Sequence, residues 1–398
     1  MSIPYDAFPY RALPISEAHV DRLAVMAHLF GGLPTAPSHA RVLELGCADG
    51  GHLVPMAEAL PHAHFVGVDL SGRQIADGHR FVEPLGLDNL QLLEGDALDL
   101  PDELGDFDYV LAHGVYSWIP AEARPRLLAA IARHLRPNGV AYVSYNTLPG
   151  WNTRATIRAF ILEHAAPTDD PVERVDGARA MLRFLHDAAD PETAHGQLMQ
   201  QTCASLLGTS PQYLIHGLLA PQNGPCTLRT FVGAAEHAGL DYLGDAVLGR
   251  MTGAALHEGG RQMVTEVPGG MVDHEQIFDV LEHRAFRQSL LVPAGTPLQR
   301  TVPWHRVTST WLTARVRCVD GDPTDDQPAR LETAAGTQRE ADAVWKVGLV
   351  TLGAHWPASM AFDRWVSSVA EVLGRDPSEV AAQLGRRVLP AWRSGSSS

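Results

Sequence analysis

Short apolar runs alternate with longer amphipathic segments between residues 41 and 146. The runs are almost continuously apolar, as in strands buried on both faces, whereas the longer segments repeat apolar residues at helical spacing. This alternation predicts right-handed β–α–β crossovers and a parallel sheet. The predicted strands lie near residues 41–45, 64–69, 90–94, 107–112 and 139–145, and the predicted helices near 52–60, 72–86 and 121–135.

The pattern changes after the fifth strand, where helical periodicity continues without intervening strands. Breaks rich in Pro and Asp separate four helical runs, which predict a helical insertion placed to cap a site at the strand ends. Two later strands predict an antiparallel edge pair that completes a seven-stranded sheet. The helical runs lie near 152–165, 172–188, 192–207 and 211–219, the strands at 240–248 and 286–292, and their helices near 227–238 and 273–284.

The two ends of the chain have patterns of their own. The first 15 residues are rich in proline and predict an extended arm, and Ser16 predicts the N-cap of a helix that ends at Gly31-Gly32. The last hundred residues predict a separate small α+β domain, either winged-helix-like or a dimerisation module. Its predicted elements are a strand over 306–319 and helices near 339–352, 361–373 and 377–389.

The first predicted strand runs directly into a glycine-rich turn, VLELGCADGG from Val42. Gly46 and Gly50 allow positive φ angles and a close approach of the backbone to a nucleotide-like ligand. Glu44 would repel a phosphate but suits a ligand with an ammonium or sulfonium group. This combination points to S-adenosylmethionine, whereas a dinucleotide site would have the fuller G-x-G-x-x-G pattern. A glycine-rich turn without any ligand is the alternative.

Two further acids follow the next two strands. Asp69 ends the second strand and is placed to accept the two hydroxyls of a ribose. Asp96 ends the third strand and could accept from the exocyclic amine of an adenine. Each acid could also be an ordinary loop or capping residue, but the series supports a nucleoside cofactor. An NAD site has no use for the second acid, and a nicotinamide dehydrogenase is the least favoured enzyme class.

The segments VLELGCADGG, FVGVDLS, LLEGDALDL, FDYVLAHGVYSW and LRPNGVAYVSYNTLPGW occur in that order. In this order the chain resembles the class I methyltransferases, and more closely a bacterial branch that carries a methyltransferase regulatory domain. That branch includes protein lysine methyltransferases acting on surface proteins. The resemblance runs from about Tyr10 to Val292. It departs from the family pattern at Ala48, where many class I enzymes have glycine, and at His216-Gly217, which replaces a more usual His-Glu pair.

The resemblance implies a Rossmann-like seven-stranded methyltransferase sheet with S-adenosylmethionine as cofactor and S-adenosylhomocysteine as product. Together with the residue pattern, it predicts an arm and lid helix (1–40), a cofactor-binding core (41–150), a helical insertion for substrate or regulation (151–226), the completion of the sheet (227–297) and, beyond the resemblance, the C-terminal domain (298–398). The cofactor-binding residues that it implies are Tyr10, Glu44, Gly46, Ala48, Gly50, Asp69, Leu70, Asp96, Ala97 and His113.

Methyl transfer from a sulfonium is an in-line displacement, so the main tasks are to align the nucleophile and to exclude water. His113 follows the fourth strand and is the candidate base, or a group that only positions its neighbours. Tyr116 and Tyr145 carry hydroxyls that could reach the nucleophile. Trp118, Asn146 and Trp151 are the candidate substrate-binding residues. Core packing is the alternative for each aromatic ring.

Composition and charge narrow the partners. The net charge of −15 argues against nucleic acid, which binds to basic tracks, and suits a cationic protein or peptide. The four cysteines and 19 histidines form no metal-ligand pattern, so no metal is expected. No apolar stretch approaches the ~20 residues of a membrane span and no signal peptide is recognised, so the expected location is the cytoplasm. A homodimer is left open.

The sequence therefore predicts a methyltransferase that modifies a lysine amine or a carboxylate of a protein or peptide. The same chemistry on the oxygen or nitrogen of a small natural product is the first alternative. A cofactor-binding regulatory protein without turnover is an alternative of another class, because no obligatory catalytic group is visible in the sequence.

Overall fold

The computed structural model describes residues 9–10, 12–165, 168–334 and 336–393. The chain divides into two compact units. The first consists of the described residues up to Ala24 together with Leu33–Ala246 and Gly269–Thr296. The second consists of Val25–Gly32, Val247–Pro268 and the described residues from Pro297 onward. None of the helices in these described ranges combines the length and the apolar character needed to cross a membrane.

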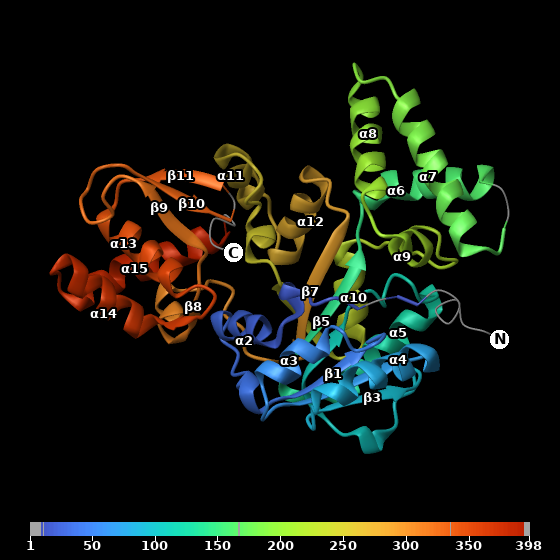
Figure 1. The fold of residues 1–398 in the computed structure, drawn as a ribbon, viewed down its shortest axis with the longest axis horizontal. Helices are drawn as coiled ribbons and strands as arrows, with labels where there is room; N and C mark the ends of the chain where they lie inside the picture. The colour runs from blue at the N-terminus through green and yellow to red at the C-terminus, as the bar shows by residue number, and fades with distance from the viewer. Residues whose placement is uncertain (1–8, 11, 166–167, 335, 394–398) are drawn as a thin grey trace. The chain divides into compact units, whose positions relative to one another are not determined.

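A seven-stranded sheet in the order β3-β2-β1-β4-β5-β7-β6 forms the centre of the first unit (Figure 1). The first five strands are parallel to one another, and β7 runs antiparallel to both β5 and β6. The predicted Rossmann-like sheet with its antiparallel edge pair is confirmed. Its strands are β1 Arg41–Leu45, β2 His64–Asp69, β3 Leu90–Glu94, β4 Phe107–Ala112, β5 Leu135–Asn146, β6 Leu240–Asp245 and β7 Phe286–Pro293.

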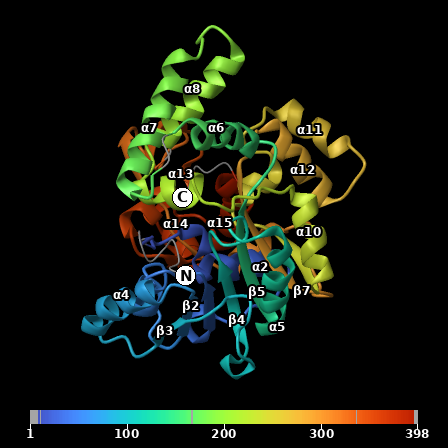
Figure 2. The same ribbon diagram turned by 90° about the vertical axis from the view of Figure 1, so that its right-hand side faces the viewer.

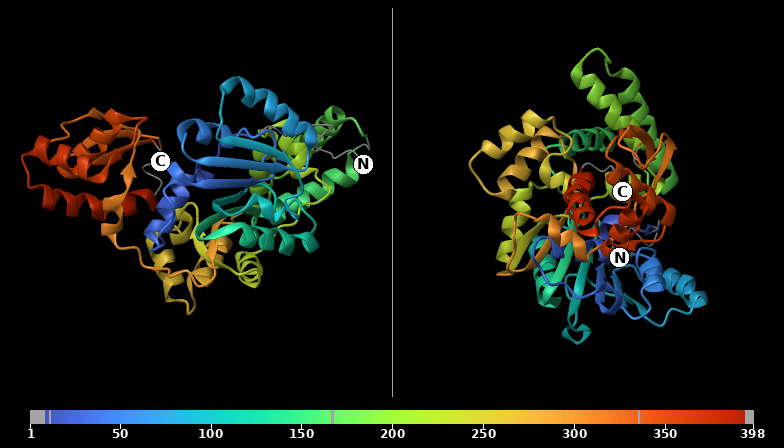
Figure 3. Two further views of the ribbon diagram at one scale, coloured as in Figure 1. Left: turned by 90° about the horizontal axis from the view of Figure 1, so that it is seen from below. Right: turned by 90° about the vertical axis from the view of Figure 1, so that its left-hand side faces the viewer.

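The strand order reverses at β1, which pairs with β2 on one edge and with β4 on the other. Figure 3 (left) shows the blue strands β1 and β2 side by side. All six residues of β4 are buried, as expected for a mostly apolar strand at the centre of the sheet, and its one charged residue, Asp108, pairs with Arg136 at 2.8 Å. In such sheets the crevice beyond the carboxyl ends at the reversal point is the usual ligand site. Helices that connect or flank these strands are α3 Leu53–Ala59, α4 Gly72–Val82, α5 Arg124–His134, α10 Leu228–His237 and α12 Met271–Leu281.

The helical insertion has a small apolar core of its own. Asp170 and Thr193 cap two of its helices, because their side chains accept backbone N–H groups at 2.7 and 3.0 Å. Ile161, Leu182 and Leu206 are buried in its core. Figure 2 shows α6, α7 and α8 together. Its helices are α6 Trp151–His164, α7 Pro171–Ala188, α8 Ala194–Leu207 and α9 Pro211–Tyr213, and α9 continues into a π-helical turn, Leu214–Leu218, called the π turn below.

Among the described residues from Pro297 onward, the second unit contains a three-stranded antiparallel sheet, a two-stranded one and three α-helices. Lys346, the single lysine of the chain, lies on α13 and is fully buried. Its Nζ donates to the carbonyl oxygens of Asp322 and Gln327 at 2.9 and 2.5 Å and pairs with the Asp325 carboxylate at 3.2 Å. The elements are β8 Trp311–Leu312, β9 Val316–Asp320, β10 Ala329–Thr333, β11 Gly336–Glu340, α13 Ala343–His355, β12 Met360–Ala361, α14 Phe362–Leu373 and α15 Pro377–Arg393.

Some predicted element boundaries are wrong. Ser16 does not cap a helix: it opens a 3₁₀ turn, Ser16–Ala18, and α2 (Val20–Leu29) begins after it. The single strand predicted over 306–319 is a 3₁₀ turn followed by two short strands. Arg306 belongs to that turn, and its Nη1 donates to the carbonyl oxygen of His28 at 2.7 Å. Helix α11 (Glu258–Glu266) and strands β10 and β11 were missed. Most residues of α11 and β11 are exposed, and β10 alternates buried and exposed positions over only five residues, which is too short a pattern to stand out.

Candidate active site

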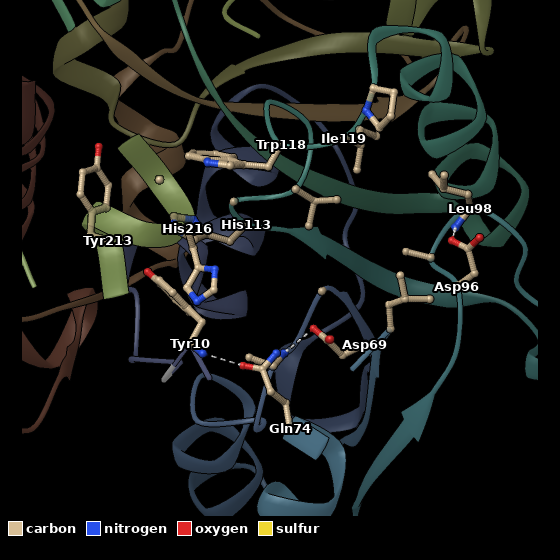
Figure 4. A pocket seen from close by; sticks show the side chains of 18 of the residues that line it. Tyr10, Asp69, Gln74, Asp96, Leu98, His113, Trp118, Ile119, Tyr213 and His216 are labelled. Atoms are coloured by element: carbon tan, nitrogen blue, oxygen red, sulfur yellow. Dashed lines mark hydrogen bonds between the residues drawn. The ribbon is translucent and has the colours of Figure 1, made fainter. Parts of the chain in front are cut away.

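A cavity of about 480 Å³ lies in the first unit, among residues that follow the carboxyl ends of β1, β2, β3 and β4 (Figure 4). This volume is within the ~300–1,000 Å³ typical of small-ligand sites. Asp69 and Asp96 lie on one side of the cavity, and we call them its acidic end. Tyr10, Tyr213 and His216 lie together on another side, and we call them its aromatic end. The predicted site residues that line the cavity are Tyr10, Gly46, Ala48, Asp69, Leu70, Asp96, Ala97, His113 and Trp118.

The glycine-rich turn has the backbone conformation that its sequence predicts. Gly46 and Gly50 have φ angles of 74° and 75°. A Cβ on Gly46 would lie 2.7 Å from Cγ2 of Val115, so the turn also needs glycine for space. Ala48 is left-handed too, with φ of 52°, and its N–H donates to Oδ2 of Asp69 at 2.8 Å. Gly50 does not line the cavity and shapes the turn instead.

Asp69 is the centre of the polar network at the acidic end. Its carboxylate accepts from the N–H groups of Ala48 and Ser71, at 2.8 and 2.9 Å, and from the Gln74 side chain. Burial raises the pKa of Asp69 above its ordinary value, an effect that these hydrogen bonds partly offset. A buried carboxylate of this kind is well suited to accept further hydroxyl donors from a ribose.

Gln74 is a site residue that the sequence analysis missed. Its Oε1 accepts from the N–H of Tyr10 at 2.9 Å, while its amide group bonds to Asp69 (Figure 4). Only 2% of Gln74 is exposed. The arm is also held at Ala12, whose N–H donates to Oδ1 of Asp49 at 3.2 Å. The signal for Gln74 was its place in the first turn of the helix that follows Asp69.

Glu44 lies behind the turn and is not among the residues that line the cavity. Its Oε1 is 2.9 Å from Nδ1 of His52, and both side chains are buried. Although burial lowers the pKa of His52, the Glu44 carboxylate outweighs it and holds this pKa above its ordinary value. Oε2 of Glu44 has no hydrogen-bond partner among the described residues. Contact of Glu44 with a cationic cofactor group stays a prediction.

His113 lines the cavity as a neutral ring. Burial, with a smaller contribution from His52, lowers its pKa to about 4. Its Nδ1 is 3.0 Å from the hydroxyl of Tyr142, which accepts from Nε2 of Gln288 at 2.9 Å. A base with so low a pKa is poorly matched to proton transfer near neutral pH. This geometry favours the positioning role over the base.

Tyr116 and Tyr145 do not line the cavity. They pack with Phe231 of α10, at ring-centroid distances of 5.2 and 4.2 Å. The Tyr145 hydroxyl is 2.9 Å from Oγ of Ser289. Burial raises the pKa of Tyr116 to about 12 and that of Tyr145 well above its ordinary value. Both rings therefore lie in the packed core, as the core-packing alternative expects.

The three predicted substrate-binding residues are separated by the structure. Trp118 lines the cavity, and its buried Nε1 has no hydrogen-bond partner among the described residues. Asn146 and Trp151 are 1% and 2% exposed and do not line it. In their place the cavity has Tyr213, His216 and Phe286, which come from the insertion and from β7. The only sequence signal for these residues was the family departure at His216-Gly217.

Comparison with known proteins agrees with this site. A family model described as a methyltransferase domain matches residues 42–139, and one described as a predicted methyltransferase regulatory domain matches residues 210–293. An uncharacterised protein of Rickettsia prowazekii is 32% identical over 235 residues, which cover 59% of this chain and 94% of that relative. A second protein of the same organism is 34% identical over 300 residues, 75% of this chain, and the chain spans only 54% of its length.

A solved structure agrees over almost the whole chain. PKMT2 from Rickettsia typhi, in complex with AdoHcy, superposes with a TM-score of 0.87 at 26% identity. The alignment covers 97% of this chain and 76% of PKMT2. AdoHcy is S-adenosylhomocysteine, the product form of the cofactor that the glycine-rich turn and the acids predict. The chain belongs to the class I methyltransferases, enzymes whose cofactor is S-adenosylmethionine.

Proposed function

We propose that this protein methylates an amine of a protein or peptide, with a lysine side chain as the acceptor. The observation that carries the proposal is the contrast between the two ends of one cavity. The acidic end offers the groups that bind a nucleoside, and the aromatic end offers rings without a carboxylate. The cofactor and the acceptor would therefore enter chemically different parts of the same space.

The acidic end fits the adenosine part of the cofactor. In this proposal Asp69 accepts the ribose hydroxyls, Asp96 accepts from the adenine amine, and Leu70 and Ala97 contact the base. The Asp96 carboxylate is exposed and accepts from the N–H of Leu98 at 2.9 Å, which leaves capacity for a second donor. When bound, S-adenosylmethionine supplies an electrophilic methyl group. The chain's own groups then have to align the acceptor and exclude water.

An amine fits the rest of the cavity better than a carboxylate does. Among the described residues that line the cavity there is neither Arg nor Lys to pair with an acidic acceptor. Aromatic rings attract the lysine ammonium to this part of the cavity. Burial between the rings then disfavours the charged form of the amine. A lysine that enters between Tyr10, Tyr213 and His216 would therefore release its proton to solvent and meet the methyl group as a neutral nucleophile. His113, neutral itself, would position groups beside it.

The charge distribution supports a basic polypeptide. Residues 1–297 carry 35 acidic and 19 basic side chains, whereas residues 298–398 carry 11 and 12. The acidic excess thus lies in the part of the sequence that holds the cavity, where it would attract a cationic partner. Acidity also serves solubility, so it supports the proposal without carrying it. The likeness to PKMT2 supports a protein acceptor as well.

The test begins with a binding titration of S-adenosylhomocysteine and S-adenosylmethionine. It continues with transfer of a labelled methyl group to lysine-containing basic peptides, each paired with the same peptide carrying arginine at every lysine. We expect micromolar cofactor binding and methylation of the lysine peptides only. Equal labelling of both peptides would exclude lysine as the acceptor. Cofactor binding without transfer to peptides would favour a small-molecule acceptor or a regulatory protein.

A further inference from the structure

The aromatic end of the cavity is built on an irregular piece of backbone. The π turn carries His216 and Gly217, both of which line the cavity, and all five of its residues are buried. Its closing hydrogen bond runs from the N–H of Leu219 to the carbonyl oxygen of Leu214, at 2.8 Å. A π turn is rare and short, and the carbonyl groups at its end lack helical partners. Something outside the helix must therefore hold it.

Asn223 provides that partner for Gly217. Its Nδ2 donates to the carbonyl oxygen of Gly217 at 2.8 Å. Its Oδ1 accepts from Nδ2 of Asn146, at the end of β5, at 3.2 Å. If the Asn223 amide were turned over, its oxygen would face the Gly217 oxygen and its NH₂ would face another NH₂. The two amides therefore fix each other's orientation.

The segment that carries Asn223 is itself attached to the strand ends. The N–H of Gly224 donates to the carbonyl oxygen of Ser117 at 2.8 Å, and Nη2 of Arg124 donates to the carbonyl oxygen of Gly224 at 2.6 Å. Two residues on, the N–H of Cys226 donates to the carbonyl oxygen of Asn146 at 3.1 Å. Ser117 stands directly before Trp118, which lines the cavity. The position of the π turn is thus tied to the same loop that forms another wall.

A second support reaches Tyr213. Nη1 of Arg154 donates to the Tyr213 hydroxyl at 3.0 Å. The same guanidinium lies 5.5 Å from the centroid of the Trp151 ring. Trp151 and Asn146 were predicted to bind substrate, but neither lines the cavity. Trp151 contacts Arg154, which bonds to Tyr213, and Asn146 bonds to Asn223, which bonds to Gly217. They support the aromatic end and do not line it.

We propose that Asn223 is a positioning residue of the acceptor site. Its bond to Gly217 holds the π turn so that His216 and Tyr213 face the methyl group, and Asn146 orients Asn223. The acceptor then meets a wall whose shape depends on two amide side chains behind it. The proposal rests on the proposed function, because it assigns the aromatic end to the methyl acceptor.

The test compares Asn223→Asp and Asn223→Ala with the wild-type protein and with a matched control, Asn89→Asp. The Asn223→Asp variant keeps an acceptor for Asn146 but loses the donor to Gly217. Asn89 lies outside the cavity, and its Nδ2 donates to the carbonyl oxygens of Ala57, Leu60 and Ala63 at 3.0–3.1 Å. The control therefore removes amide donors from buried carbonyls without touching the acceptor site.

We expect both Asn223 variants to raise KM for the acceptor peptide by about tenfold, as one lost hydrogen bond predicts. The Kd for S-adenosylhomocysteine should stay within about twofold of the wild-type value, because the lost hydrogen bond lies away from the acidic end that binds the cofactor. Asn89→Asp should lower the melting temperature and leave KM unchanged. An unchanged KM in Asn223→Asp, or a Kd that rises in proportion to KM, would overturn the proposal.

A second readout does not need the acceptor. Amide hydrogen exchange in the presence of S-adenosylhomocysteine should be faster for the peptide that contains Leu219 in both Asn223 variants, and unchanged in Asn89→Asp. Unchanged exchange in Asn223→Asp would contradict the positioning role even if no acceptor is found. If the wild-type protein methylates no peptide while the exchange result holds, the proposed function fails and the support of the π turn stands.

Discussion

The two ends of the cavity are built in different ways. The acidic end comes from consecutive strand–turn units: Asp69 is the last residue of β2, and Asp96 lies in the turn just after β3. The aromatic end joins the arm at Tyr10 to the π turn more than 200 residues later in the chain, and the rings of Tyr10 and His216 meet at 6.2 Å. The sheet itself fixes the positions of the residues at the acidic end. Side-chain hydrogen bonds that attach loops to the sheet fix those at the aromatic end.

This difference suggests how one fold serves many acceptors. A cofactor site made of strand ends changes little when loops are exchanged, because backbone geometry fixes its carboxylates. An acceptor site made of loops and an insertion can change without disturbing the cofactor. Substitutions at the acidic end should therefore affect cofactor binding, and those at the aromatic end should affect the acceptor.

Asp69→Ala should have the largest effect. It removes the carboxylate that organises the turn and that we assign to the ribose, and hydrogen bonds to a charged group contribute ~1.5–3 kcal/mol each. The affinity for S-adenosylhomocysteine, measured by calorimetry, should fall by roughly 100-fold or more. Asp77→Ala, which removes a surface partner of Arg80, is the control and should bind normally. Binding of Asp69→Ala within threefold of wild type would mean that the acidic end is not the cofactor site.

The pH dependence of stability tests the neutral state of His113. Its folded pKa of about 4 lies below the ordinary value of 6.5, so the unfolded chain binds more protons between these two values. Stability should therefore fall as the pH drops from 6.5 towards 4, and His113 should account for about 2 kcal/mol of the loss between pH 7 and 5. Urea unfolding of His113→Asn should show a correspondingly smaller loss. Equal pH dependence of His113→Asn and wild type would contradict the neutral state of the ring.

Gln74→Met tests the link between the arm and the acidic end. The variant keeps the volume of the side chain but loses its bonds to Tyr10 and Asp69. We expect about a tenfold loss of S-adenosylhomocysteine affinity, because one or two hydrogen bonds of ~0.5–1.5 kcal/mol disappear. KM for the acceptor should rise less than the Kd for the cofactor. A larger rise in KM for the acceptor than in Kd for the cofactor would mean that Gln74 acts on the acceptor site and not on the cofactor site.

Tyr116→Phe should have the smallest effect. The ring stays in its aromatic cluster, and the hydroxyl does not line the cavity. Steady-state kcat and KM should stay within about twofold of wild type, since no hydrogen bond to a reacting group is lost. Tyr145→Phe is a useful companion, because it loses the bond to Ser289 and should cost about 1 kcal/mol of stability without loss of activity. A large fall in kcat for Tyr116→Phe would restore the catalytic role that the sequence suggests.

The same contrast explains what the sequence could reveal. Asp69, Asp96 and the Gly46 turn were predictable because a strand followed by a turn places them at the site within a few residues. Tyr116 and Tyr145 were predicted at the site because both lie near strand ends. Tyr145 is in β5, where side chains alternate between the two faces of the sheet, and Tyr116 is in the turn after β4; both rings pack against Phe231 of α10. Gln74 and Tyr213 were missed because their roles depend on contacts with Tyr10 and Arg154 that no local pattern encodes.

The buried Lys346 has a practical consequence for every assay of this enzyme. Its amine is enclosed by three oxygen atoms and is the only lysine amine in the chain. Towards amine-reactive dyes and cross-linkers, the folded protein behaves as one without lysine. In a reaction mixture, methyl-lysine found by mass spectrometry would therefore originate from the acceptor, and the enzyme needs no separation from it beforehand.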